Sequence, residues 1–174
     1  MEIPGLGPVV LQDSSGWHRS NSLPVPVLGT SCHFVVEGYE DDPRKDDFHA
    51  AIANFLDADP TALRASAPAI FAYYQDVRTD VGDERDFPAI GEPDDVWQHI
   101  ELGREVMVER DTGGDGRVYL SIECECDWEP EHGLQIVFRD GTAVTKVGPY
   151  DSHVTNANAY GQAELRDVVY HPTS

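Results

Sequence analysis

Residues 118–128, VYLSIECECDW, alternate strictly between two kinds of side chain, and this stretch decides the fold class. The apolar set is Val118, Leu120, Ile122, Cys124, Cys126 and Trp128. The intervening set is Tyr119, Ser121, Glu123, Glu125 and Asp127. Because successive side chains of a strand point to opposite faces, the pattern predicts a long, half-buried antiparallel strand. We expect this strand to be central in its sheet, with Cys124 and Cys126 buried.

Further strands are predicted on both sides of this stretch. Leu134, Ile136 and Phe138 alternate in the same way, and Asp140-Gly141 is a hairpin turn signal. With EVMVERD at 105–111, these segments predict a β-meander over about 104–147. A second meander is predicted over about 8–39, in which the prolines of LPVPVL at 23–28 allow an edge strand only.

The region between the meanders, about 46–102, has helical periodicity. Phe48, Ile52, Phe55 and Leu56 recur on one helical face, and Asp46 or Asp47 is a candidate cap. Asp59-Pro60 marks a second helix start, and Pro68 predicts a kink or two short helices. A third, short helix is predicted from Pro93 to a stop at Gly103.

These segments together predict an α+β fold in a single domain covering residues 1–174. Antiparallel meanders stand at both ends of the chain, and two to three helices pack on one sheet face. Residues 148–174 form a C-terminal loop and tail.

The charge of the chain narrows the classes of partner. Acidic residues number 32 and basic residues 12, which gives a formal net charge of -20. This surplus argues against a nucleic-acid binder and against docking on anionic membranes. No apolar run approaches the ~18 residues of a spanning helix, and the first residues lack the pattern of a secretory signal. We therefore expect a cytoplasmic protein with neither membrane nor nucleic acid as partner.

Acidic side chains concentrate around the helical region, where they suggest a docking face for a basic protein. The candidate residues are Asp41, Asp42, Asp46, Asp47, Asp83, Glu84, Asp86, Asp94 and Asp95. Complementary charge raises association rates by roughly 10 to 1,000-fold. The alternative interpretation is a solvated acidic surface that keeps the protein soluble.

The stretch CECDWEPEHGLQIVFRDGTAVTKVGPYDSHVTNANAY resembles the C-terminal signature of a bacterial family of unknown function. FVVEGYEDD, FHAAIANFL and APAIFAYYQD resemble its earlier blocks, so the likeness runs from about Val9 to Tyr170. It implies glycine at position 152, where this chain has Ser152. Small acidic proteins of this kind resemble toxin-immunity proteins, although this likeness is one of general type and not of a shared site.

A metal site is the main alternative to a docking protein. His132, Asp151 and His153 lie in loops that we expect at the same end of the sheet, and zinc or another divalent metal suits such ligands. Zinc on Cys124, Cys126 and His132 is a weaker hypothesis, because C-x-C is tighter than the usual spacing and core packing explains both thiols.

The sequence contains no G-x-S-x-G, H-E-x-x-H or phosphate-loop motif. We therefore expect a non-enzymatic acidic binding protein without cofactor, of the kind of an immunity protein that neutralises a basic toxin. The second hypothesis is a small metal-binding domain or metal-dependent enzyme.

Overall fold

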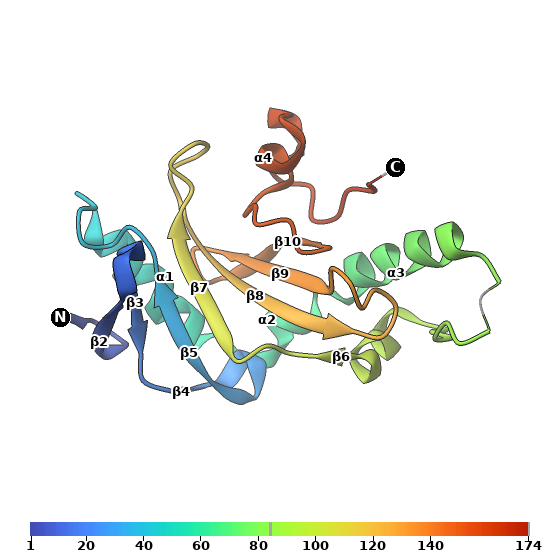
Figure 1. Ribbon diagram of the computed structural model, residues 1–174, viewed down its shortest axis with the longest axis horizontal. Coiled ribbons are helices and arrows are strands. Elements are labelled where there is room, and N and C mark those ends of the chain that lie inside the picture. Colours follow the sequence, from blue (N-terminus) through green and yellow to red (C-terminus); the bar gives the residue numbers. More distant parts are fainter. Residues whose placement is uncertain (84, 174) are drawn as a thin grey trace.

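The computed structural model describes residues 1–83 and 85–173, and it confirms a mixed α+β fold (Figure 1). The strands are β1 (Glu2–Ile3), β2 (Gly7–Gln12), β3 (Trp17–Ser20), β4 (Leu23–Val25), β5 (Thr30–Val36), β6 (Ile100–Glu101), β7 (Glu105–Arg110), β8 (Val118–Cys126), β9 (Leu134–Arg139) and β10 (Ala143–Gly148). The helices are α1 (Lys45–Asp57), α2 (Pro60–Arg64), α3 (Ala67–Val81) and α4 (Asn156–Tyr160), with 3₁₀ turns η1 (Asp13–Ser15), η2 (Pro26–Leu28), η3 (Pro93–His99) and η4 (Ala163–Leu165).

The two predicted meanders join into one sheet. Its strands follow the order β1-β2-β3-β5-β7-β8-β9-β10, while β4 pairs with β5 and β6 pairs with β8. The junction is a parallel ladder between β5 and β7, in which His33 pairs with Glu105 and Val36 with Val108. A parallel pair needs a long crossover, and here the crossover is the helical region. The sequence pattern predicted the meanders but not this junction.

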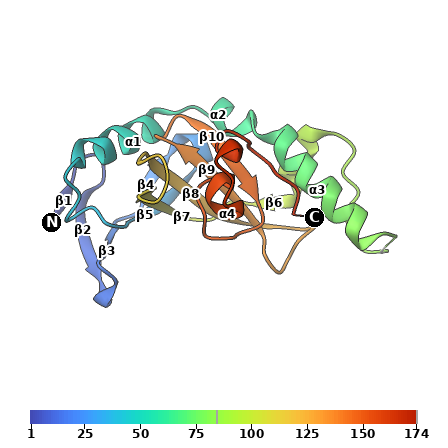
Figure 2. The same cartoon turned by 90° about the horizontal axis from the view of Figure 1, so that it is seen from above.

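Strand β8 is central, as predicted, and its apolar face carries the core. Leu120 and Ile122 are fully buried, and Cys124 and Cys126 are 2% and 5% exposed. Helices α1, α2 and α3 lie along this one face of the sheet (Figure 2). The ring of Phe55 in α1 meets that of Phe138 in β9 edge-on at 5.0 Å between centroids. The apolar face of the helix that the sequence predicts therefore packs on the apolar face of the sheet.

The opposite face of the sheet is covered in part. Tyr119 and Val137 point to this face, yet both are fully buried, and they form a small cluster with Val154. Val154 belongs to the segment after β10, so this segment covers Tyr119 and Val137. The alternation put Tyr119 on the correct face, but the cover that buries it comes from a segment distant in the sequence. The rest of this face stays open.

Helix boundaries agree with the sequence in part. Helix α2 begins at the predicted start, where Asp59 Oδ1 caps it by accepting a hydrogen bond from Thr61 N at 2.7 Å. Helix α1 begins at Lys45 without a side-chain cap, and Asp46 and Asp47 lie in its first turn instead. Acidic side chains there still favour the helix dipole.

The third helix was predicted to reach Gly103, and this was wrong. Pro93–His99 is a 3₁₀ helix, and it ends because Ile100 and Glu101 pair with β8 as strand β6.

Among residues 1–83 and 85–173, no helix is both long and apolar enough to cross a membrane.

Candidate functional site

A wide groove of about 1310 Å³ crosses the sheet face that the helices leave open. Its floor consists of outward side chains of β7, β8 and β9, namely Met107, Glu109, Ser121, Glu123 and Gln135. Trp17 of β3 and Tyr150 of the loop after β10 also line it. The groove exists because the segment after β10 covers only the part of this face around Tyr119 and Val137.

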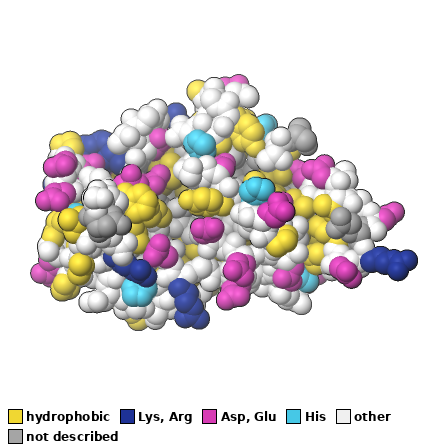
Figure 3. Space-filling view, in the orientation of Figure 1, with side chains coloured by type: hydrophobic (Ala, Val, Ile, Leu, Met, Phe, Trp, Pro, Cys, Tyr) yellow, Lys and Arg dark blue, Asp and Glu magenta, His cyan; other side chains and the backbone are white. Residues whose placement is uncertain are grey.

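Carboxylates dominate the lining of this groove. They belong to Glu37, Glu101, Glu105, Glu109, Glu123, Glu125, Asp127, Glu129 and Glu131. Among the described residues, Arg104 is the one Lys or Arg that lines it. Figure 3 looks onto this face, and acidic side chains gather over its middle. A concave surface with one sign of charge concentrates the field, so the groove attracts cations.

Glu109 is the most perturbed of these carboxyls. Burial, together with the smaller effects of the neighbouring charges of Glu37 and Asp111, raises the pKa of Glu109 to about 7. A carboxyl with this pKa is partly protonated at neutral pH. A cation bound beside it would draw the proton off, because it favours the ionised form.

Glu109→Gln is expected to make the protein more stable at high pH. The pKa of Glu109 is raised in the fold. The stability that Glu109 contributes is therefore fully present below about pH 4.5 and is lost as pH rises through about 7. Between pH 5 and 8 the stability of the variant relative to the parent should rise by about 1–2 kcal/mol, allowing for solvent screening of a half-buried group. Urea unfolding at both pH values measures this, and a pH-independent difference would contradict it.

Two of the acidic residues predicted for docking serve the fold instead. The Asp42 carboxylate accepts two hydrogen bonds from Arg110, one from Nε at 2.7 Å and one from Nη2 at 3.0 Å. The side chains of Asp42 and Arg110 are 8% and 7% exposed. Asp47 Oδ2 accepts from Arg110 Nη1 at 2.8 Å. Asp42 is therefore not free to meet a partner, and Asp47 is largely neutralised.

The other acidic candidates form two separate groups. Asp41 and Asp46 are exposed near the start of α1, and Asp83, Asp86 and Asp94 are exposed beyond α3, with Asp95 half-buried. Glu84 lies outside the described residues. The start of α1 and the end of α3 stand at opposite ends of the long axis in Figures 1 and 2. The structure does not bring these residues together into one face.

The metal candidates are also divided. The loops that carry them do meet, because Tyr150 N donates to His132 O at 3.1 Å. Asp151 and His153 come close, with 3.6 Å between Asp151 Oδ1 and His153 Nδ1, but His132 does not join them. Asp151 Oδ1 also accepts from the buried Lys146 Nζ at 2.7 Å and from His153 N at 2.9 Å. Burial lowers the pKa of Lys146, while its bond to Asp151 opposes this shift. Asp151 thus holds the loop in place.

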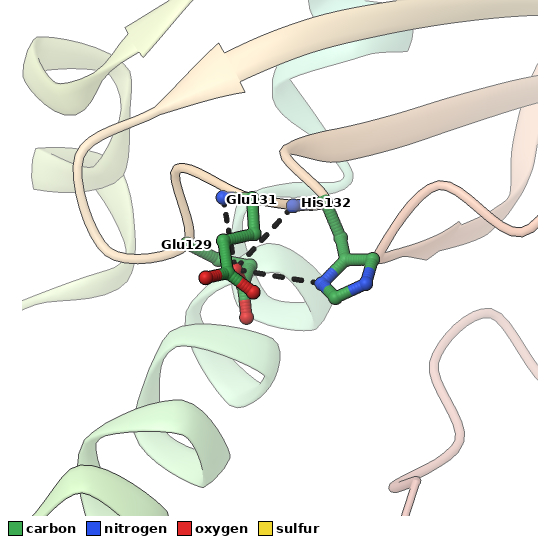
Figure 4. A group of neighbouring side chains, drawn as sticks. All are labelled: Glu129, Glu131 and His132. Carbon is green, nitrogen blue, oxygen red and sulfur yellow. Dashed lines mark hydrogen bonds and ion pairs between the residues drawn. The ribbon is translucent and has the colours of Figure 1, made fainter.

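A different trio does converge at the groove margin. Glu129, Glu131 and His132 place one ligand atom each within 4.8 Å of one another (Figure 4). Within the described residues, this is the one group of three or more His, Cys, Asp or Glu side chains whose ligand atoms lie this close together. It shares only His132 with the predicted set. Glu129 Oε1 also accepts from the backbone N of Glu131 at 3.1 Å, so the carboxylate caps the turn as well.

Ser152 stands where the family resemblance implies glycine. Its φ is 62°, in the left-handed region where glycine is favoured. Ser152→Gly is therefore expected to stabilise the protein by about 0.5–1 kcal/mol, since relief of strain outweighs the added chain entropy. As a control, Ser31→Gly in β5 should destabilise by a similar amount. Denaturant titration measures both, and equal signs would contradict the interpretation.

Comparison with known proteins places the chain in a family. Residues 6–154 match the model of DUF6985, a domain of unknown function. The match covers most of the chain, and the protein belongs to this family. No curated protein and no solved structure matches it.

Proposed function

We propose that this protein is a non-enzymatic binding protein that accepts a basic segment of a partner protein in the acidic groove. The observation that carries the proposal is the excess of carboxylates over cations among the lining residues. Lys and Arg side chains reaching the floor would meet Glu109 and Glu123 on adjacent strands. The biological role we propose is that of an immunity protein which neutralises a basic toxin in the cytoplasm.

The state of the thiols argues against a cysteine nucleophile in the groove. Cys124 and Cys126 are among the residues that line it, and burial raises the pKa of both to about 12. Neither provides a thiolate at neutral pH, and the thiolate is the reactive form.

Capture of a basic protein at low and high salt tests the proposal. Glu109→Gln/Glu123→Gln removes two groove carboxyls, and Asp83→Asn/Asp86→Asn removes two exposed charges away from the groove. The groove variant should bind the captured partner roughly tenfold more weakly, and the control variant should bind like the parent. Equal loss in both would show a net-charge effect only, and binding insensitive to salt would rule out electrostatic docking.

A divalent-metal site is the second candidate function, favoured by the convergence of Glu129, Glu131 and His132. Two carboxylates and an imidazole are suitable ligands for zinc or another first-row metal. Calorimetric titration with Zn²⁺ should show binding that His132→Ala removes and His153→Ala leaves intact. Loss in both variants would favour the set His132, Asp151 and His153, and absence of heat would exclude zinc.

A further inference from the structure

The sheet has an open, apolar edge at β2. Strand β1 pairs only with its beginning, through Glu2 with Pro8 and Ile3 with Gly7, and Val9 N donates to Met1 O at 2.9 Å. In the part of the chain that the structure describes, no strand continues this pairing beyond Val9. Because backbone groups alternate between the two edges of a strand, Leu11 points its N–H and C=O to the same open side as Val9.

The side chains around this edge are unusually apolar for exposed positions. Val10 is 72% exposed, Leu11 52% and Trp17 36%. Together with Met1, they are four of the five exposed large hydrophobic residues in the described chain; the fifth is Tyr150. Proteins normally protect an open edge with charge, proline or a covering segment, and an apolar open edge is typical of an interface.

The charge distribution indicates what covers the edge. Residues 3–12 contain no charged side chain, although the whole chain carries a net charge of -20. Two copies of this chain repel each other over most of their surface, so a neutral segment is where they can approach. An antiparallel pairing about a two-fold axis at Leu11 is self-complementary, since each Leu11 N–H meets the other Leu11 C=O.

We propose that β2 pairs with β2 of a second copy, joining two sheets into one across a two-fold axis. A two-fold axis perpendicular to the sheet keeps the same face of both copies on one side. The two acidic grooves then lie on that side, with Trp17 of each copy lining its groove near the junction. The short ladder buries less than the ~1,200 Å² of a standard interface, so the dimer is weak and depends on concentration.

Sedimentation over a concentration series tests the pairing without any partner. The dimer fraction should rise with concentration and should also rise from low to high salt, because salt screens the repulsion between like-charged copies. Binding of a basic partner in the groove has the opposite salt dependence, so the two proposals fail independently. A monomer at every concentration and salt would overturn the pairing. The edge would then be available to a strand of a different protein.

Two variants and one exchange measurement locate the interface. Leu11→Glu should weaken dimerisation at least ~10-fold, whereas Tyr150→Glu, at the exposed hydrophobic residue outside this edge, should leave it unchanged. Val10→Glu serves as a second edge variant. In the parent protein, hydrogen exchange at the Leu11 amide should slow as concentration rises. A dimer that survives both edge variants, or a Leu11 amide with unchanged exchange, would overturn the proposal.

Discussion

Asp42→Ala is expected to lower the free energy of unfolding by about 3 kcal/mol, at the low end of the cost of breaking a buried ion pair. The side chains of Asp42 and Arg110 are both under a tenth exposed, and two hydrogen bonds join them. Arg110 also lies over the Phe48 ring, 5.3 Å from its centroid. The cost stays at the low end because Arg110 keeps its bonds to Asp47 and to the carbonyl of Gly116.

Asp46→Ala is the matched control, because Asp46 lies nearby with a fully exposed side chain. Its stability should change by less than ~0.5 kcal/mol. The hydrogen bonds from Arg110 lower the pKa of Asp42, so its contribution is present above its ordinary pKa and is lost as pH falls through the lowered one. The Asp42→Ala deficit should therefore be constant from about pH 5 to 8 and shrink below about pH 4. Equal losses in both variants would contradict the buried pair.

Asp42 also shows why charge read from a sequence locates a docking surface poorly. Its partner Arg110 is 68 residues away, and nothing in local spacing links the two. A carboxylate that pairs inside the fold and one that faces solvent look the same in the sequence. The acidic residues that flank the helices are a weaker candidate for docking than the groove. Some of them are paired within the fold, and they lie at both ends of the molecule.

The groove carboxylates have a signal in the sequence, but it predicts only the face of the sheet on which they lie. Glu123 and Glu125 occupy the polar positions of the alternation in β8, and Glu109 does so in β7. Periodicity shows that these residues share a face, but it does not show whether that face is flat or concave. The concavity depends on where the segment after β10 lies, and that segment has no periodic pattern of its own.

What periodicity does predict is the side of the sheet on which a residue lies, together with the existence of each strand. Val118–Cys126 follows the predicted alternation over its whole length, and the hairpin at Asp140-Gly141 has the positive φ values of 51° and 72° that its turn type requires. The parallel junction of β5 with β7 lay beyond such reasoning. Pairing between distant strands is decided by how the crossover helices pack, which no local pattern encodes.

The face assignment itself has a direct test in Cys126→Asp, which is expected to destabilise the protein by about 3 kcal/mol. Cys126 is 5% exposed among core residues, and an aspartate there would lack a charged partner. Glu125→Asp places the same side chain one position away on the open face, and it should change stability by less than ~0.5 kcal/mol.

Thiol labelling checks the same burial in the parent protein. Cys32, Cys124 and Cys126 are free and buried, and burial raises the pKa of each thiol. Labelling should therefore be slow in the native state and fast after unfolding, because only an accessible thiolate reacts. Fast labelling of Cys126 in folded protein, or an unchanged melting temperature in Cys126→Asp, would place this residue on the solvent side. The helices would then pack on the other face of β8, and the groove would lose its floor.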